Sequence, residues 1–519
     1  MKLNYKRTVL VGFAFFLICA FWQAYDNTIP LILTNKFGMS QTWSGMIMAA
    51  DNVLALFLLP LFGAISDRHN GKRGRRTPFI VVGTLIAAVA LIALSFVEGA
   101  QLRHIEDVAA IDDPVALETI YEAQADNTLL APNGEKFVLG EKFTKEEFVA
   151  IRSSVTDENG HTSTNHDYTA YVVPARQACA WQTTAESPMT LFFFVGLLLV
   201  ILVSMAVFRS PAVALMPDVT MKPLRSKANA VINLMGSAGG ILVLALGMVF
   251  ATASVRNSLM SYTGYFAVIA FIMLAALVIF LTTVHEKEWA AEMQADSIKY
   301  GIEEASEAET SASSRSLSPE EKKSMIFILL SIVLWFFGYN AVTSKYSVYA
   351  SNILHKDYNL TLIIAQAAAI VAYLPVGFIA SKVGRKKTIM AGVAMLTVAF
   401  GAAAFMRADS PAMLMNVLFA LAGIAWATIN VNSFPMVVEL CSGGDVGKYT
   451  GFYYTASMAA QVATPMLSGY LMDKMGMTTL FPYAAVFVAL ALVTMNFVKH
   501  GDSCPVAKKG LEALEDMEG

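Results

Sequence analysis

The stretch that decides the fold is I-C-A-F-W-Q-A-Y-D-N at residues 18–27, because a similar stretch, I-V-L-W-F-F-G-Y-N-A, occurs at residues 332–341. The two are 314 positions apart, and the same offset relates G-A-I-S-D at 63–67 to G-F-I-A-S at 377–381. A long internal repeat indicates a chain built from two similar halves. In a membrane protein, such halves are typical of a transporter that holds its substrate between them.

The composition is that of a membrane protein. Hydrophobic residues make up 56% of the chain and charged residues only 15%, against about 25% charged in a soluble domain. The apolar residues gather in blocks that can each span roughly 30 Å of hydrocarbon as a helix. We therefore expect an all-α membrane protein with twelve transmembrane helices in two pseudo-symmetric six-helix bundles. The blocks are about 8–34, 41–65, 77–97, 189–216, 229–252, 260–284, 324–350, 359–380, 388–408, 411–437, 450–472 and 479–498.

Basic residues indicate the orientation of these helices. The N-terminus is basic, and so are the loops at 68–76, 222–227 and 382–387, whereas the alternate loops carry one or two basic residues each. Loops rich in Lys and Arg stay in the cytoplasm. The apolar run from Val9 continues to Leu33 without a cleavage site, so we expect it to be retained as the first helix. The expected protein is a multi-pass protein of the cell (inner) membrane with both termini in the cytoplasm.

A polar insertion interrupts the first half. Pro211 matches Pro435 at an offset of 224, which is 90 less than the offset upstream. Asp113-Pro114 and the capping box Thr144–Glu147 each predict a short helix within the extra stretch. Three interpretations stay open: a cap over the substrate entrance, a docking site, or a tolerated surface insertion. The expected divisions are 1–97 for helices 1–3, 98–188 for an extracytoplasmic insertion, 189–284 for helices 4–6, 285–323 for a cytoplasmic linker, 324–498 for helices 7–12 and 499–519 for a cytoplasmic tail.

The insertion and the linker show no sign of chemistry. His104, His161 and His166 lack the spacing of metal ligands, so we expect solvated histidines and no metal or cofactor. The linker is rich in Glu, Ala and Ser and ends in a capping box, Ser318 to Glu321, that starts the next helix. A flexible tether between two moving halves explains its composition.

Two carboxylates lie within predicted membrane spans. Asp26 is eight residues before Thr34, ~12 Å from the outer end of its helix, and Asp51 is ten residues after Gln41, ~15 Å from the outer end of the next. Antiparallel neighbours thus place both at a similar depth. Because intramembrane carboxylates are costly and mark proton relays, we predict that Asp26 and Asp51 carry the coupling proton. The alternative is that one caps a broken helix or pairs with a lysine.

Arg209 is a third intramembrane charge. It follows Met189 by 20 residues, which places it ~30 Å along its helix. At that depth we expect no easy pairing with Asp26. We interpret Arg209 as a gate partner for an acid such as Asp218 or Glu439, with a substrate ligand as the alternative.

The repeated stretches combine aromatic rings with amide side chains. Flat aromatic faces together with groups that both donate and accept hydrogen bonds are what sugar binding needs. The alternative role for each residue is helix packing, since amides join membrane helices and tryptophans gather at interfaces. The predicted substrate-binding residues are Trp22, Gln23, Tyr25, Asn27, Asn52, Trp335, Tyr339, Asn340, Gln366, Trp426 and Asn430.

The basic loop after the second helix has its own pattern. Its arginines fit simple anchoring in the cytoplasm, but anchoring does not explain Gly63 or Asp67. A small residue at Gly63 permits close helix contact, and an acid at Asp67 can meet an arginine or a helix N-terminus and close that side. The predicted gate residues are Gly63, Asp67, Arg68, Arg75, Arg76, Arg209, Asp218, Arg225 and Glu439.

The pattern G-x-x-x-D-R with a downstream G-R-R resembles the signature loop of the major facilitator superfamily. The variant D-R-H-N-G-K-R-G-R-R-T-P at 67–78 is similar to that of its glycoside–cation symporters and sucrose–proton symporters. P-A-V-A-L-M-P-D-V at 211–219, with Arg225 to Asn229 after it, resembles the region of helices 4 and 5 in that branch. The resemblance implies a two-bundle fold that opens to either side of the membrane and takes up a sugar with a cation.

The chain departs from this branch in two places. Plant-type sucrose symporters carry an arginine shortly after the helix-4 proline, where this chain has Val213 and Leu215, and its nearest arginine is Arg209. Melibiose-type carriers build a sodium site from two acids one turn apart on helix 2. Here Asp51 is followed one turn later by Ala55, which favours H⁺ over Na⁺ as the coupling ion.

Three functions fit the sequence. The first is a proton-coupled symporter of a glycoside or oligosaccharide such as sucrose or maltose. The second is a proton-coupled exporter of amphipathic or lipid-like compounds, and the third is a transporter-like sensor that uses residues 98–188 as its external module. We expect no enzyme, since no nucleophile–base set or phosphate loop is present. The expected partners are a small-molecule substrate and the lipid bilayer, with no nucleic acid, and the expected state is a monomer.

The repeat also predicts a division of labour. At the offset of 314, Asp26 corresponds to Asn340, Asp51 to Ala365 and Asp67 to Ser381, so each acid of the first copy is uncharged in the second. We therefore predict that the N-terminal half handles the proton and the inner gate, while both halves bind the substrate.

Overall fold

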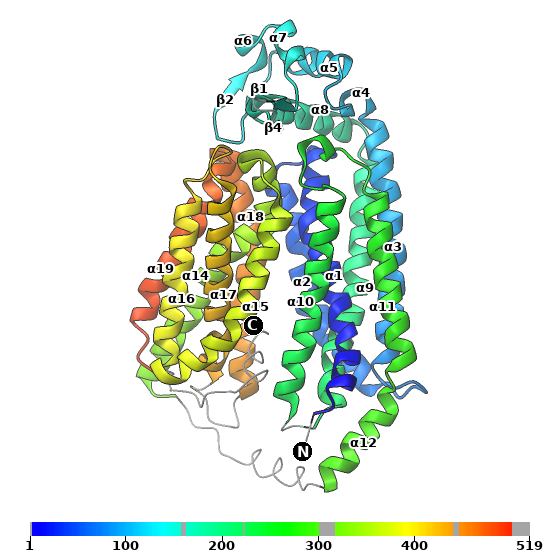
Figure 1. Ribbon diagram of the computed structural model, residues 1–519, viewed down its shortest axis with the longest axis vertical. Helices are drawn as coiled ribbons and strands as arrows, with labels where there is room; N and C mark the ends of the chain where they lie inside the picture. The colour runs from blue at the N-terminus through cyan, green and yellow to red at the C-terminus, as the bar shows by residue number, and fades with distance from the viewer. Residues whose placement is uncertain are drawn as a thin grey trace.

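Two bundles of long helices stand side by side in the computed structural model, which describes residues 3–156, 162–221, 224–299, 317–438, 440 and 446–500 (Figure 1). The first bundle contains α1 (Tyr5–Asn35), α2 (Gln41–Arg68), α3 (Thr77–His104), α9 (Met189–Asp218), α10 (Arg225–Val249) and α11 (Thr263–Thr283). The second contains α14 (Pro319–Tyr349), α15 (Tyr358–Val383), α16 (Arg385–Ala403), α17 (Ala412–Val438), α18 (Val446–Met475) and α19 (Leu480–Asn496).

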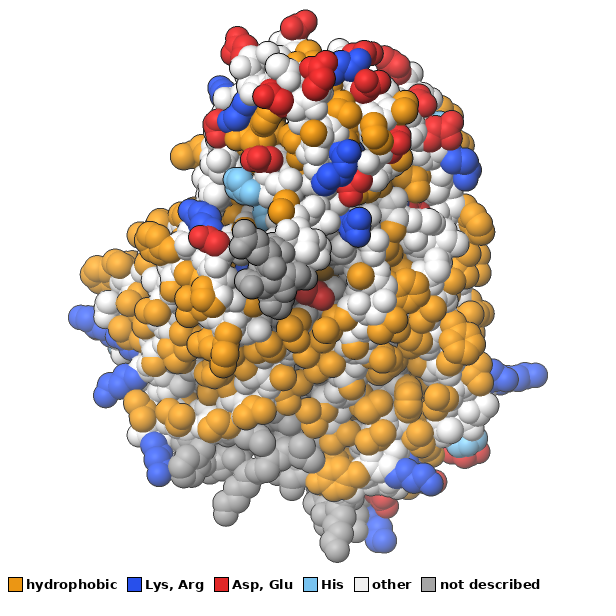
Figure 2. Space-filling view, turned by 45° about the horizontal axis from the view of Figure 1, so that its top comes forward, with side chains coloured by type: hydrophobic (Ala, Val, Ile, Leu, Met, Phe, Trp, Pro, Cys, Tyr) orange, Lys and Arg blue, Asp and Glu red, His pale blue; other side chains and the backbone are white. Residues whose placement is uncertain are grey.

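The helices have the length and composition of membrane spans. Within the described residues, 10 helices are long and apolar enough to cross a membrane, and only α15 and α18 of the two bundles fall short of that measure. Large apolar side chains such as Phe57, Phe192 and Phe271 are exposed on the outside of the bundles. Figure 2 shows the resulting apolar belt below an acidic cap. The predicted all-α fold of two six-helix bundles is confirmed.

Each bundle has its own apolar core. The first is built around side chains such as Phe21, Phe194 and Phe266, and the second around Trp335 and Phe481. Small residues bring helices into direct backbone contact. A Cβ on Gly83 of α3 would lie 2.7 Å from the Ser204 carbonyl oxygen of α9, and one on Gly338 of α14 would lie 2.6 Å from that of Ala484 on α19. Close packing at small residues is how membrane helices associate in the absence of a hydrophobic drive.

Residues 105–187 form a separate small unit at one end of the first bundle, which we call the module. Two antiparallel hairpins pair Thr128–Leu130 with Lys136–Val138 and Ser154–Thr156 with Thr162–Thr164. The predicted N-cap at Asp113 and the capping box at Thr144 and Glu147 are both present. Its elements are α4 (Glu106–Ala109), α5 (Pro114–Gln124), β1, β2, α6 (Leu139–Lys142), α7 (Lys145–Ala150), β3, β4, η1 (Tyr168–Val172) and α8 (Val173–Glu186).

The helix before the module is longer than predicted. The apolar block ends at residue 97, yet α3 continues to His104. The reason is that the polar residues after the block are buried and have partners: Glu98 forms an ion pair with Lys36, and Gln101 donates a hydrogen bond to Thr184 Oγ1 at 2.9 Å. The helix α3 therefore runs past residue 98, where the extracytoplasmic insertion is predicted to begin.

The first part of the linker is a helix, whereas the sequence predicted a flexible tether. Residues Glu286–Lys299 form the helix α12, which packs below the first bundle with Trp289 buried and 5.0 Å from the Arg7 guanidinium. The capping box predicted at Ser318 and Glu321 starts α14. Below, the module end is the end of the bundles that carries the module, and the linker end is the opposite end. Short turns lie at η3 (Val255–Asn257), η4 (Ala350–Leu354) and η5 (Met477–Thr479).

Candidate functional site

A cavity of about 330 Å³ lies between the two bundles. On α15 its lining residues recur every three or four positions, which is the spacing of one helix face. The first bundle contributes polar side chains, whereas the second contributes mainly aromatic and aliphatic ones. The lining residues are Gln23, Asp26, Asn27, Ser237, Tyr339, Val342, Thr343, Tyr346, Leu362, Ala365, Gln366, Ala369, Ile370, Tyr373, Phe400, Phe419, Ala422, Gly423 and Trp426.

Two stacked rings form one wall of the cavity. The rings of Tyr339 and Trp426 have centroids 3.5 Å apart and planes within 4° of parallel, and Phe336 meets Trp426 edge to face at 5.3 Å. Stacking fixes the orientation of both rings. The wall therefore offers a rigid aromatic platform to an apolar face of a ligand.

An amide pair joins the two halves across the cavity. Gln366 Nε2 of α15 donates to Gln23 Oε1 of α1 at 2.5 Å. Among the described residues, the buried Oε1 of Gln366 has no hydrogen-bond partner. A buried acceptor without a partner costs free energy, so a ligand hydroxyl placed there would gain a hydrogen bond that is otherwise missing.

Asp26 also faces the cavity, and two other charges lie near it. Asp51 of α2 and Arg209 of α9 are both close enough to interact with Asp26 electrostatically. Asp51 accepts a hydrogen bond from Asn52 Nδ2 at 2.8 Å. The predicted similar depth of the two carboxylates agrees with this arrangement, while their role in proton coupling stays a prediction.

The Arg209 side chain lies nearer to Asp26 and Asp51 than expected, and its role as a gate residue stays a prediction. It interacts with Asp26 and Asp51, and its guanidinium lies 5.9 Å from the Trp22 ring, whereas Asp218 pairs with other arginines. Side chains on a helix lean toward its N-terminus, and the N-terminus of α9 is at the module end. The long Arg209 side chain therefore extends back toward the carboxylates. A depth calculated from the rise per residue of the helix does not include the length of the side chain.

Five of the eleven predicted substrate-binding residues line the cavity: Gln23, Asn27, Tyr339, Gln366 and Trp426. Tyr25 is 3% exposed between Phe21 and Trp22, and Trp335 is 1% exposed in the core of the second bundle. The other four do not line the cavity in the described structure. Three of them contact other side chains: Trp22 contacts Arg209, Asn52 contacts Asp51, and Asn430 contacts Tyr373. The fourth, Asn340, has a buried amide nitrogen without a partner in the described residues. Tyr25 and Tyr339 thus differ in environment despite the repeat.

Some lining residues were missed by the sequence analysis. Thr343 and Tyr346 follow Tyr339 by four and seven positions, and Tyr373 follows Gln366 by seven. These are the spacings of one helix face. Extending the face of each predicted residue along its helix would have found all three.

The predicted linker-end gate forms a cluster around Arg76. Its guanidinium pairs with Asp67 and, at 2.8 Å, with Asp218, which also lies 3.1 Å from Arg75. Burial alone would lower the pKa of Arg76, but the two carboxylates outweigh it and raise that pKa. Gly63 lets α2 approach α9, since a Cβ there would lie 2.8 Å from Ser210 Oγ. This cluster fixes the end of α2 to α3 and α9.

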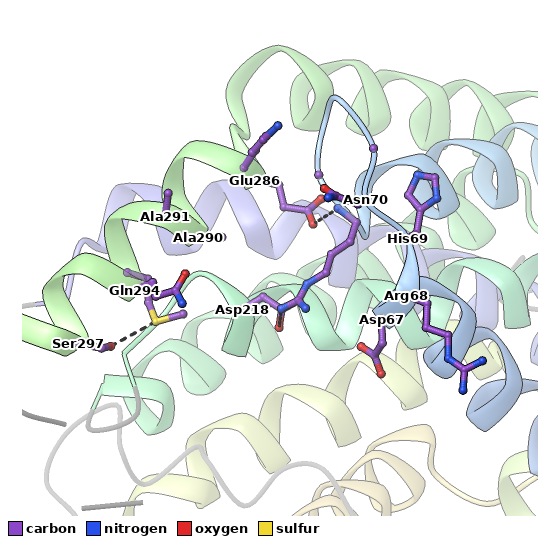
Figure 3. Close-up of a pocket in the computed structure, with 15 residues that line it drawn as sticks. Asp67, Arg68, His69, Asn70, Asp218, Glu286, Ala290, Ala291, Gln294 and Ser297 are labelled. Carbon is purple, nitrogen blue, oxygen red and sulfur yellow. Dashed lines mark hydrogen bonds and ion pairs between the residues drawn. The ribbon is translucent and has the colours of Figure 1, made fainter. Parts of the chain in front are cut away.

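The other predicted gate residues are Arg68, Arg225 and Glu439. The Arg68 side chain borders a surface hollow of about 650 Å³ between the α2–α3 loop and α12 (Figure 3). Residue Arg225 begins α10, and Glu439 lies outside the described residues. The described residues that line the hollow belong to the first half and α12.

Glu286, the first residue of α12, is a part of this cluster that the sequence analysis missed. It is 2% exposed, and its carboxylate accepts hydrogen bonds from the backbone N–H groups of Arg75, Arg76 and Thr77 at 2.7–2.8 Å and from the Thr77 hydroxyl at 2.7 Å. A carboxylate at a helix N-terminus satisfies otherwise unpaired N–H groups and favours the helix dipole. Glu286 thereby fastens α12 to the start of α3.

Replacing Glu286 with Ala is expected to destabilise the first bundle by about 3 kcal/mol, because three backbone N–H groups at the start of α3 lose a charged acceptor. The measurement is the unfolding temperature of the purified protein in detergent. Glu288→Ala is the matched control, since Glu288 is exposed on the same helix. Equal unfolding temperatures for the two variants would contradict the role given to Glu286.

At the module end, a second cluster joins the two halves. Asp473 of α18 accepts hydrogen bonds from the backbone N–H groups of Gln41 and Thr42 of α2, both at 2.7 Å, and from the Thr42 hydroxyl at 2.5 Å. The fully buried Lys345 of α14 donates to the Gln41 carbonyl oxygen at 2.7 Å. A Cβ on Gly469 would lie 2.3 Å from that same oxygen. The halves are therefore in direct contact at the module end.

Neither charge of this cluster was among the predicted gate residues. Lys345 lies within the predicted span 324–350, where an ionisable side chain is unusual and signals a function, whereas Asp473 follows the predicted span 450–472. The sequence signal was thus present at Lys345 but not at Asp473.

Comparison with known proteins identifies the fold and the family. The inward-open structure of the xylose transporter XylE from E. coli is similar with a TM-score of 0.60 and 14% identity, over 99% of this chain and 100% of that one. The MFS-type transporter ppzB of Metarhizium rileyi is 27% identical over 131 residues, which are 25% of this chain and 26% of that protein. The sucrose transport protein SUC4 of Arabidopsis thaliana is 34% identical over 59 residues, which are 11% of this chain and 12% of that protein.

The family described as Major Facilitator Superfamily matches residues 11–105 and 347–513, a little over half of the chain. These two ranges fall in both halves and leave out the module. The match agrees with the two bundles and with the cavity between them. The chain therefore belongs to the major facilitator superfamily of multi-pass membrane transporters.

Proposed function

We propose that the protein is a proton-coupled symporter that takes up a glycoside or oligosaccharide by alternating access. The observation that carries the proposal is that Asp26, an aromatic platform and polar amides line one cavity between the halves. In this proposal the substrate binds in that cavity, and the basic linker end with both termini faces the cytoplasm.

The cavity suits a sugar in chemistry and in size. A sugar ring has apolar C–H faces and a rim of hydroxyls, which match a stacked aromatic wall and amide side chains. Tyr339 and Trp426 supply the wall, and Gln23, Asn27 and Gln366 supply the amides. About 330 Å³ falls in the range of small-molecule sites.

The coupling proton is assigned to Asp26, with Asp51 as its neighbour. Intramembrane carboxylates that face a cavity are typical of proton relays. Asp26 lines the cavity in which the substrate binds, so the protonation of Asp26 and the binding of the sugar influence each other. Arg209 lies near both carboxylates and can compensate their charge when the proton leaves.

The names of similar proteins support a sugar as the substrate class. XylE is a xylose transporter and SUC4 a sucrose transport protein. The match to SUC4 is short and the likeness to XylE concerns the fold, so the choice of a glycoside rests on the cavity.

A second candidate function is proton-coupled export of an amphipathic compound. The observation that favours it is the apolar wall contributed by the second bundle, which includes Leu362, Phe400 and Phe419. Thermal stabilisation of the purified protein by a panel of disaccharides and of lipid-like amphiphiles separates the two functions. Stabilisation by the amphiphiles alone would replace the first proposal with the second.

Replacing Trp426 with Ala is expected to raise the KM for a transported disaccharide about tenfold, because half of the stacked platform is lost. The measurement is the initial rate of uptake of labelled sucrose or maltose into vesicles. Trp335→Phe is the matched control, since Trp335 lies in the apolar core and does not line the cavity. A KM that is unchanged by Trp426→Ala would remove the platform from the binding site.

A further inference from the structure

The module is attached firmly to the first half. It continues directly from α3 and into α9, and its apolar core includes Val255 and Leu259 of the α10–α11 loop. Gln177 of α8 donates to Asn35 Oδ1 at the end of α1 at 2.9 Å. Gly38 lies against α8, since a Cβ there would be 2.2 Å from the Gln177 carbonyl oxygen. The module therefore moves with the first half.

The same module also contacts the second half, and it does so through a few polar contacts. The backbone N–H of Met477 donates to the Pro132 carbonyl oxygen at 2.7 Å, and the Thr478 hydroxyl donates to that of Asn133 at 3.3 Å. At a second point, Thr169 Oγ1 and His355 Nε2 are 2.7 Å apart. These contacts tie the β1–β2 turn to η5, and η1 to η4.

Two glycines make the first contact possible. Gly134 of the module and Gly476 of the second half both have φ of +94°, a conformation that other residues rarely adopt. A Cβ on Gly476 would lie 2.3 Å from the Gly134 nitrogen, and one on Gly134 would lie 2.3 Å from the Met475 carbonyl oxygen. The two backbones thus meet without intervening side chains, as in a fitted interface.

These contacts lie beside the cluster that closes the module end. Met477 follows Asp473 by four residues, and His355 follows the end of α14, the helix that carries Lys345. A movement that separates Asp473 from the start of α2 must therefore also separate Met477 from the module. The module and the cluster act on the same opening.

We propose that the module is a strap that binds the second half when the module end is closed and that must release it each time that end opens. This inference rests on alternating access between the two halves, but it does not depend on the substrate or on the coupling ion. Each hydrogen bond of the strap shifts the equilibrium between the closed and open states about fivefold toward the closed state. Together these bonds slow opening without preventing it.

His355 makes the strap sensitive to pH. Burial, reinforced by the charge of His166, lowers the pKa of His355 to about 4 in the docked state, from its ordinary value of about 6.5. The nearby Lys356 also opposes protonation, while Arg407 and Asp409 line the adjoining cavity of about 340 Å³ with opposite charges. Docking is therefore strongest above about pH 6.5 and weakens, by at most tenfold per unit, as the pH falls toward 4.

Opening of the module end can be measured without any substrate. Gln41→Cys places a thiol in the closed interface, where the backbone contacts of residue 41 are kept, and a membrane-impermeant maleimide labels it only when that end opens. We expect Thr169→Val together with Thr478→Val to raise the labelling rate about 25-fold, because two strap contacts are lost. Thr119→Val is the control, since Thr119 is exposed on α5 and bonds only within that helix in the described structure. An unchanged rate would overturn the strap.

The pH dependence gives a second readout. Because maleimides react with the thiolate, the labelling rate of the Gln41→Cys protein is divided at each pH by that of an exposed Thr119→Cys. Between pH 7.5 and 5 this relative rate is expected to rise, by at most about 30-fold, and His355→Gln is expected to remove that rise. A rise that persists in full in the His355→Gln protein would assign the pH dependence to other groups and contradict this part of the proposal.

A reversible lock tests the need for release. Asn133→Cys with Thr478→Cys places two thiols across the contact, and their disulfide is expected to reduce both maleimide labelling at residue 41 and sucrose uptake by more than tenfold until a reductant is added. The Asn133→Cys variant alone is expected to behave as wild type, whereas Thr478→Cys alone is expected to open about fivefold faster, because its hydroxyl hydrogen bond is lost. Rapid labelling of residue 41 in the oxidised protein would overturn the strap. If oxidation slows labelling but the reduced protein transports no sugar, the result would contradict the proposed substrate and leave the strap intact.

Discussion

Proton-driven accumulation of sugar is expected to be lost when Asp26 is replaced with Asn. One proton per sugar allows an accumulation ratio of about tenfold for each unit of pH difference. Without a titratable group at residue 26, uptake no longer draws on that gradient, so the ratio should fall to one. Asn keeps the size and polarity of the side chain, and Asp26 lines the same cavity as the amides, so the binding site itself should survive.

The measurement for Asp26→Asn therefore has two parts. Accumulation of labelled disaccharide in vesicles under an imposed pH gradient should be abolished, whereas exchange of internal for external sugar at equal pH should continue. Asn27→Asp in the Asp26→Asn background is a matched variant that returns a carboxylate to the next residue of the cavity wall. Intact accumulation by an Asp26→Asn, Asp51→Asn double variant would contradict the coupling assignment.

The second large effect is expected at the module end. Asp473→Ala removes three charge-assisted hydrogen bonds between the halves, two to the backbone of α2 and one to the Thr42 hydroxyl. Water replaces part of this loss in the open state, so the net change is about 3 kcal/mol, which shifts the equilibrium toward opening by roughly 100-fold. The buried Lys345, whose ammonium group bonds to the Gln41 carbonyl, loses a nearby negative charge at the same time.

Maleimide labelling of Gln41→Cys measures this shift directly. Lys474→Ala is the control, because Lys474 is the exposed neighbour of Asp473 on α18. A labelling rate that rises equally in both variants would show a general loosening of α18, and an unchanged rate in Asp473→Ala would remove this residue from the gate.

The repeat and the apolar blocks were sufficient to predict the architecture. Membrane helices must satisfy their backbone hydrogen bonds internally, so length and hydropathy largely determine them. The prediction failed where polar side chains have specific partners: Glu98 and Gln101 extend α3 beyond its apolar block because Lys36 and Thr184 satisfy them. Such partners are distant in the sequence and leave no local signal.

The site could be predicted only in part for the same reason. Residues on the helix faces that meet at the cavity, such as Gln23 and Tyr339, follow from the repeat. The reach of Arg209 toward Asp26 depends on the direction of a long side chain, which helical rise does not describe. Glu286 was missed because a carboxylate that binds a distant helix N-terminus looks like any other acid in a polar linker.

Proton movement driven by sugar is the most direct test of proton-coupled symport. The purified protein is reconstituted into vesicles with a trapped pH indicator, and sucrose or maltose is added outside in the absence of a pH gradient. Symport predicts acidification of the vesicle interior that depends on the sugar and is absent in the Asp26→Asn protein. Sugar entry at the same rate without any change in internal pH would contradict it.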